Sequence, residues 1–155
     1  MGRPMNDPSE EPLAFLFSDV ARLFWRRLET AWARAGHDFG SAEVRVLITI
    51  VDNPGLRQAQ LAERLYIEPM TLVGHLDRLG GRGLVERRAD PGDRRAKLVF
   101  PTERAAPVLE ELRAISAGIR AAQTAGVSAD EAAALRGLLT RVRANLAGFD
   151  IGEGR

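Results

Sequence analysis

The chain of 155 residues contains no cysteine, which excludes disulfide bonds, thiolate zinc sites and thiol-based redox sensing. Its two histidines, His37 and His75, lie far apart in the chain and fit no metal-ligand spacing. No apolar run is long enough to span a membrane, and the N-terminus lacks the apolar segment of a signal peptide. We therefore expect a cytoplasmic protein that holds no metal or cofactor and does not contact a membrane.

Motifs for catalysis are also lacking. The glutamate pairs at 10–11 and 110–111 are adjacent residues, which point apart on a helix and normally face water. The glycine-rich stretch 80–83 lacks the Lys-Ser/Thr pair that follows a phosphate-binding loop, and is typical of a helix end instead. We predict no catalytic residue, and the sequence favours a binding protein over an enzyme.

The net charge of +1 does not by itself indicate a nucleic-acid partner, but its distribution does. From Arg57 to Lys97 there are nine Lys/Arg and six Asp/Glu, an excess of three positive charges, while the remainder of the chain is net negative. Lys97 is the single lysine. Arginine favours bidentate contacts with phosphate and guanine, although a GC-rich genome would produce the same bias.

The spacing after Glu68 predicts a helix with two distinct faces. Leu72, Leu76 and Leu79 recur at steps of four and three, which places them on one side. The other side offers a hydroxyl, an imidazole and guanidinium groups, which bond base edges or phosphates. Predicted DNA contacts on this helix are Pro69, Met70, Thr71, His75 and Arg78, with Gln58 and Arg82 in support. The alternative is an ordinary amphipathic helix with a solvated polar face.

A basic hairpin is predicted directly after this helix. The segments 84–88 and 97–100 have the composition of short strands, and Pro91-Gly92 is a turn signal, because proline presets φ at one turn position and glycine tolerates a positive φ at the next. Asp93 lies two residues before Arg95, so its carboxylate can orient that guanidinium for a groove, with Arg94 and Lys97 nearer the phosphates. A solvated loop with a weak ion pair is the alternative.

The remaining residues predict helices with apolar stripes. Residues 1–12 are rich in Pro, Glu, Asp and Ser and are expected to form a mobile tail. We expect a helix at 13–36, a DNA-binding region at 41–101 with a helix capped by Ser41, and helices at 102–149, within one domain overall. The last two helices are expected to be capped by Thr102 and by Ser128 with Glu131. The outer helices have too little core of their own, which favours a homodimer over a monomeric bundle.

These features resemble those of the MarR family. The segments 61–65, 67–73 and 76–79 look like its helix-turn-helix, and Asp90-Pro91-Gly92-Asp93-Arg94-Arg95-Ala96-Lys97 looks like its wing, including the Asp-x-Arg element. Residues 18–23 and the wing are most similar to the SlyA-like branch. The resemblance implies a mainly α-helical winged helix-turn-helix with a small β-hairpin wing, flanked by N- and C-terminal dimerisation helices. It also implies a regulator that binds palindromic double-stranded DNA, usually as a repressor, often released by small aromatic acids.

Two departures from the SlyA-like pattern bear on function. Gly74 stands where SlyA-like proteins carry an arginine in the recognition helix, so base reading at this step is expected to fall to Thr71 and His75. Val44 and Ile48 stand where those proteins carry the tryptophan and histidine of their ligand pocket, so a pocket here is expected to be more apolar or absent. The candidate pocket residues for an aromatic carboxylate are Arg22, Trp25, Trp32, Val44, Arg45 and Ile48, with His37 as a further donor.

Two alternatives to a repressor remain open at this point. One is a transcriptional activator or anti-silencing factor of the same fold. The other is a protein-binding winged helix that has lost its affinity for DNA, an alternative that Gly74 keeps open because glycine supplies no donor.

Overall fold

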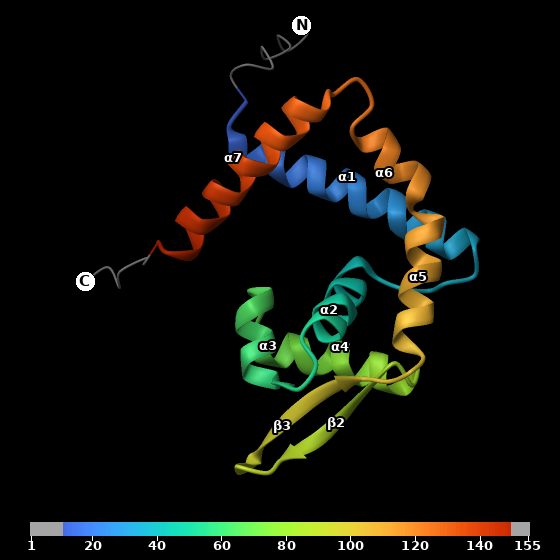
Figure 1. Cartoon of the computed structure of the whole chain (residues 1–155), viewed down its shortest axis with the longest axis vertical. Helices are drawn as coiled ribbons and strands as arrows, with labels where there is room; N and C mark the ends of the chain where they lie inside the picture. The colour runs from blue at the N-terminus through green and yellow to red at the C-terminus, as the bar shows by residue number, and fades with distance from the viewer. Residues whose placement is uncertain (1–10, 150–155) are drawn as a thin grey trace, which may run out of the picture. The chain divides into compact units, whose positions relative to one another are not determined.

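The computed structural model describes residues 11–149, apart from the side chain of Arg94. The elements within the described residues are α1 (Leu13–Arg34), α2 (Ser41–Asp52), β1 (Leu56–Arg57), α3 (Gln58–Leu65), α4 (Pro69–Gly81), β2 (Val85–Asp90), β3 (Asp93–Pro101), α5 (Ala105–Ile115), α6 (Ala117–Gln123) and α7 (Ala129–Ala147) (Figure 1). The expected tail at 1–12 lies outside the described residues apart from its last two positions. Of the described helices, none is both long and apolar enough to cross a membrane.

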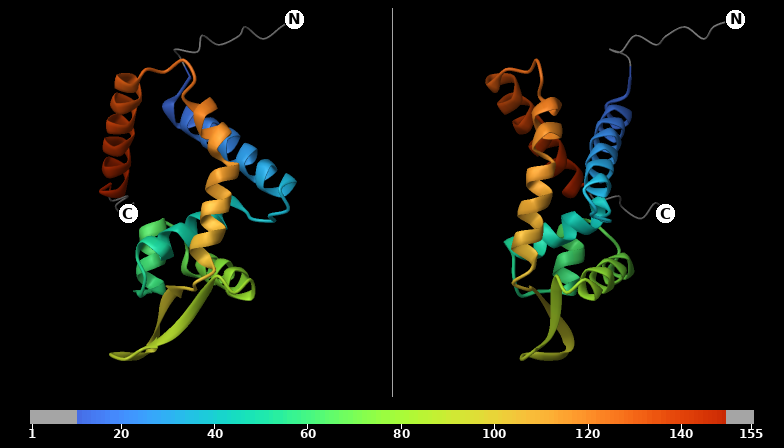
Figure 2. Two further views of the ribbon diagram at one scale, coloured as in Figure 1. Left: turned by 45° about the vertical axis from the view of Figure 1, so that its right-hand side comes forward. Right: turned by 90° about the vertical axis from the view of Figure 1, so that its right-hand side faces the viewer.

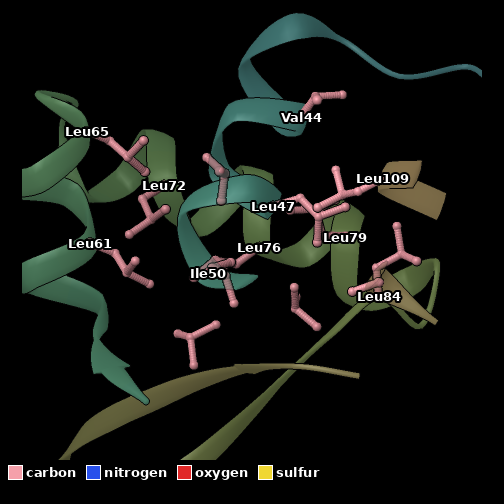
Figure 3. Close-up of a cluster of buried hydrophobic side chains, with 14 of the residues drawn as sticks. Val44, Leu47, Ile50, Leu61, Leu65, Leu72, Leu76, Leu79, Leu84 and Leu109 are labelled. Carbon is pink, nitrogen blue, oxygen red and sulfur yellow. The ribbon is translucent and has the colours of Figure 1, made fainter. Parts of the chain in front are cut away.

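The chain forms two compact units, one ending at Ile119 and the other beginning at Arg120. In the first unit, α2, α3 and α4 enclose an apolar core (Figure 3). Leu72, Leu76 and Leu79 of α4 are at most 1% exposed, as their spacing predicts. Burial of three leucines fixes which face of α4 is left for solvent, and that face carries the polar residues.

A three-stranded antiparallel sheet with strand order β1-β3-β2 packs against this core, to which it contributes Val85 and Val99. The predicted hairpin is present, and its long strands project away from the helices (Figure 2). Its strands are longer than expected, because Ala89 pairs with Lys97 and Asp90 with Asp93. The tip therefore contains only Pro91 and Gly92. Gly92 is not among the positive-φ glycines of the described residues, so the turn does not use the positive φ that glycine tolerates. The third strand, β1, was not predicted because its two residues carry no pattern.

The end of α4 depends on Gly83, which adopts φ +67°. Its N–H donates to the carbonyl of Gly80, and the next N–H, of Leu84, donates to Leu79. Such bonds satisfy carbonyls at a helix C-terminus, and the left-handed conformation they need is accessible to glycine. The predicted helix end at 80–83 is confirmed, and it directs the chain into β2.

α1 and α5 are joined to the core through Trp32, which is 2% exposed. Its indole N–H donates to the hydroxyl of Ser116 at 2.9 Å, where α5 gives way to α6. Thr102 does not cap a helix as expected, because its hydroxyl donates to the carbonyl of Gly83 at 2.7 Å and α5 begins at Ala105. Pro107 therefore lies in the first turn of α5, where it does not force a bend.

Two other expected caps had different outcomes. Ser41 is the first residue of α2 rather than its cap, because Gly40 holds the N-cap position and its N–H donates to the Glu43 carboxylate at 3.3 Å. In the second unit the predicted capping box of α7 is confirmed: the Ser128 hydroxyl accepts from the Glu131 N–H, and the Glu131 carboxylate accepts from the Ser128 N–H. These bonds lower the pKa of Glu131.

Candidate nucleic-acid interface

The first turn of α4 is open to solvent. Pro69 occupies the first helical position, where a missing N–H removes no helical bond. Met70 is 79% exposed, and Thr71 is also exposed. Free backbone N–H groups at a helix N-terminus attract phosphate oxygens. Tyr66, just before α4, adopts φ 54° and is 69% exposed. Sequence reasoning missed Tyr66 because nothing in the residue pattern marks a left-handed tyrosine.

One turn further along, α4 is bound to α2 by a carboxylate that is buried. Glu43 is 6% exposed, and its Oε1 accepts from Nε of Arg78. A second donor of Arg78, Nη2, lies 2.7 Å from Nδ1 of His75. Arg78 was expected to reach toward the groove with the rest of the polar stripe. Its guanidinium is instead engaged by α2 and by its own helix, although about half of its side chain is exposed.

His75 is only partly exposed, and its environment favours the neutral ring. Burial, followed by the positive charge of Arg78, lowers the pKa of His75, while Glu43 acts in the opposite direction. A Cβ added at Gly74 would meet only a guanidinium nitrogen of Arg78, at 3.8 Å. The space beside Gly74 is thus open enough for a side chain, but an arginine there would lie against a like charge.

The wing is stabilised at its tip by bonds that differ from those expected. Asp93 Oδ1 accepts from the backbone N–H of Arg95 at 3.0 Å, so it orders the strand and does not orient the guanidinium. Arg95 and Lys97 are exposed. The side chain of Arg94, also predicted as a contact, lies outside what the structure describes. The arginine of the Asp-x-Arg element therefore extends from an ordered turn without its carboxylate as a clamp.

A second carboxylate, Asp90, anchors the turn of the wing and an arginine of β1. Its Oδ1 accepts from the Gly92 N–H at 2.8 Å and its Oδ2 accepts from Arg57 Nε at 2.7 Å. The Gly92 bond most of all, and then Arg57, lower the pKa of Asp90 against an opposing effect of burial. Sequence reasoning missed this pair because Arg57 and Asp90 are 33 residues apart and meet only when β1 joins the sheet.

Two further arginines stabilise the wing, one against α4 and one within the hairpin itself. Arg87 of β2 donates to Asp77 of α4 at 2.7 Å and to the Val73 carbonyl at 3.3 Å. Arg88 lies over the ring of Phe100, 4.3 Å from its centre. The Arg87 bonds join the hairpin to α4, so the helix and the wing keep a fixed relation to one another.

Comparison with known proteins identifies this arrangement. The MarR family matches residues 40–97, which run from the start of α2 into β3. A cysteine-to-serine variant of MarR from E. coli, solved in complex with operator DNA, is 30% identical over 84% of this chain and 93% of that chain, with a TM-score of 0.76. The chain belongs to the MarR family. Proteins of the MarR family are transcriptional regulators, not enzymes.

More distant MarR-type structures share the fold. The transcriptional regulator SlyA is 20% identical over 88% of this chain and 95% of that chain, with a TM-score of 0.78. A MarR-family regulator from Rhodococcus sp. RHA1 is 24% identical over 93% and 97%, with a TM-score of 0.76. At these identities the likeness concerns the winged-helix fold alone, so the SlyA-like branch stays a prediction.

The two supporting contacts predicted for this MarR domain occupy different environments. Gln58 is the first residue of α3 and is partly buried. Arg82 lies over the ring of Phe39, 4.3 Å from its centre, and 3.9 Å from a carboxylate oxygen of Asp38. Arg82 therefore packs on the connection between α1 and α2, which its position in the α4 stripe did not indicate.

The six residues predicted to line a ligand pocket lie in different environments and do not line one cavity. Trp32 and Val44 are sealed in the core at 2% and 4% exposure. Arg22 is on the surface and pairs with Asp19 at 2.6 Å, and Trp25 packs edge-on against Phe24. Arg45 and Ile48 line an open hollow of about 450 Å³, whose other lining residues are Thr49, Asp52, Asn53, Arg64 and Leu65.

His37, the further donor considered for this pocket, is bound elsewhere. Its Nε2 lies 3.1 Å from Glu111 of α5, and its ring stacks on Phe39. Within residues 11–149 no group of three or more His, Asp or Glu side chains is placed to hold a metal ion.

Proposed function

We propose that this MarR-family protein is a sequence-specific double-stranded DNA-binding repressor that acts as a homodimer. The observation that supports it best is the joining of α4 to the wing through Arg87 and Asp77. This joint keeps the exposed stripe of α4 in a fixed relation to the exposed Arg95 and Lys97. A helix of this width fits the major groove, and a basic hairpin beside it suits the flanking phosphates or minor groove.

The dimer is supported by apolar surface that a single chain leaves exposed. In α1 the exposed apolar residues are Leu13, Phe15, Leu16, Val20 and Leu23; in α7 they are Leu135, Leu138, Leu139 and Leu146. Stripes of this size on a monomer usually mark a protein interface. A twofold dimer would carry two copies of α4 to successive major grooves about 34 Å apart on a palindromic operator.

We propose a small aromatic carboxylate as the effector. The open hollow between α2 and α3 offers the guanidinium groups of Arg45 and Arg64 beside the apolar Ile48, a combination suited to such an anion. An effector weakens DNA binding only by the ratio of its affinities for the free and DNA-bound forms. Calorimetry with salicylate, with and without operator DNA, tests this, and equal affinity in both states would contradict control by release.

The DNA-binding proposal is tested with a duplex selected from a random pool by the purified protein. We expect affinity to fall steeply with salt, because each neutralised phosphate releases counterions. Arg95→Ala should weaken binding to the selected duplex by roughly tenfold, whereas Arg113→Ala, on an exposed face of α5, should leave it unchanged. Equal affinities for the Arg95 variant and the wild type would remove the wing from the mechanism.

The two alternatives give different results in the same assays. A protein-binding winged helix would show no salt-dependent affinity for any duplex. An activator or anti-silencing factor would bind the same operator, but a reporter placed behind that operator would gain expression when the protein is present.

A further inference from the structure

We infer that His75 reads the operator as a hydrogen-bond donor with a fixed tautomer, in which Nε2 carries the proton and Arg78 and Glu43 are the positioning residues. This inference rests on the proposed DNA-binding function and specifies which base atoms α4 recognises. It predicts contact with an acceptor in the major groove that is N7 of a purine or O4 of thymine.

The tautomer follows from the donor inventory of arginine. A guanidinium has five N–H donors and no acceptor. Since Nη2 of Arg78 lies 2.7 Å from Nδ1 of His75, Nδ1 must be the acceptor and carries no proton. A proton on Nδ1, whether in the other tautomer or in the charged imidazolium, would face another donor. The neutral ring then carries its proton on Nε2.

The buried carboxylate of Glu43 keeps Arg78 in this orientation. Its Oε1 accepts from Nε of Arg78, and its Oε2 accepts from the N–H of Gly40, which fixes the carboxylate at the start of α2. Glu43 is buried, and a buried carboxylate retains its charge when it is paired and hydrogen-bonded. The rotamer of Arg78, and with it the tautomer of His75, is therefore set by α2 before DNA arrives.

The other ring nitrogen is available to a ligand. Among the described residues, Nε2 of His75 has no hydrogen-bond partner, and no fully buried side-chain nitrogen or oxygen lacks one, so Nε2 is not sealed from solvent. His75 follows the exposed Thr71 by one helical turn on the same face of α4. Gly74 adds no side chain between them, which leaves the N–H of His75 unobstructed by its neighbour.

The tautomer is tested without DNA, by nitrogen-15 NMR of the imidazole rings at pH 7.5. With only two histidines, the spectrum of the His37→Gln variant identifies the signals of His75. We expect Nδ1 to be unprotonated and Nε2 to be protonated. In an Arg78→Met, Glu43→Gln double variant, which removes the donor without leaving a buried charge, the ring should become a mixture of tautomers. A protonated Nδ1 in the wild type would overturn the inference.

The reading role is tested with the selected duplex, in which each purine is replaced in turn by its 7-deaza analogue and each thymine by 5-methyl-2-pyrimidinone. These bases lack N7 or O4 respectively. We expect one position in each half-site to lose roughly threefold to tenfold in affinity, the loss of one neutral hydrogen bond. The His75→Phe variant should bind the duplex with that replacement as tightly as it binds the unmodified duplex, because phenylalanine keeps a ring but has no N–H to lose a partner.

Failure of the inference and failure of the proposed function are distinguishable. If the wild type binds no duplex with a salt-dependent affinity, the proposed function fails and the reading role fails with it. If it binds DNA but every replacement costs the same in His75→Phe as in the wild type, only the reading role of His75 is overturned.

Discussion

Helices α4 and α7 are both predicted by leucines at helical spacing, yet their environments are opposite. Leu72, Leu76 and Leu79 of α4 are at most 1% exposed, while Leu135, Leu138 and Leu139 of α7 are 52%, 50% and 42% exposed. α4 has three buried residues and α7 has none. An apolar stripe therefore specifies that a helix must be covered, but not whether its own chain or a partner covers it.

The largest effect is expected from truncating a leucine of α4. Leu76→Ala removes atoms from a closed core, and we expect the free energy of unfolding to fall by about 3 kcal/mol because a cavity remains. Urea denaturation followed by circular dichroism measures the loss. A change below about 1 kcal/mol would mean that the contacts of α4 do not carry the stability of the core.

A charge on the stripe of α7 tests the other half of the comparison. In Leu139→Asp, we expect the dissociation constant of the dimer to rise on the order of 100-fold, since a carboxylate would be buried without a partner. Sedimentation velocity across a dilution series measures it, with Leu139→Met as an apolar control. If both variants dimerise like the wild type, the partner does not cover this part of α7.

A smaller effect is expected at the joint between α2 and α4. Glu43→Gln keeps the shape but removes the charge that holds Arg78, and should lower the free energy of unfolding by about 1 kcal/mol, less than a fully buried pair because Arg78 is half exposed. Glu86→Gln is the matched control, because its partner Arg88 is exposed on the wing. Equal losses in the two variants would argue against a special role for Glu43.

The smallest effect is expected from titrating His75, which faces Arg78 and, through it, Glu43. Because the pKa of His75 is lowered on folding, the unfolded chain binds the proton more readily. The free energy of unfolding should fall as the pH drops through about 6.5, the ordinary pKa of histidine, toward the lower folded value. In His75→Gln, the free energy of unfolding should depend less steeply on pH over the same range. A wild type whose stability is flat between pH 7.5 and 5 would contradict the shift.

The sequence predicted the features that depend on local spacing. The three leucines of α4, the glycine at its C-terminus and the capping box of α7 are each set by residues within a few positions of one another, and each is confirmed. Prediction was less successful where a single residue had several available partners. Asp93 was assigned to the Arg95 guanidinium, but it accepts from the backbone N–H of Arg95 instead, and the Thr102 hydroxyl bonds Gly83 instead of capping a helix.

The sequence alone thus determined that α4 has a buried face and a polar face, and that a short basic hairpin follows it. Only the tertiary structure decided how the polar groups pair. Arg57 meets Asp90, and Glu43 meets Arg78, across 33 and 35 residues. Periodicity shows which side of an element faces inward, because that depends on the geometry of one helix or strand. It cannot show which charges meet, because that depends on how separate elements pack.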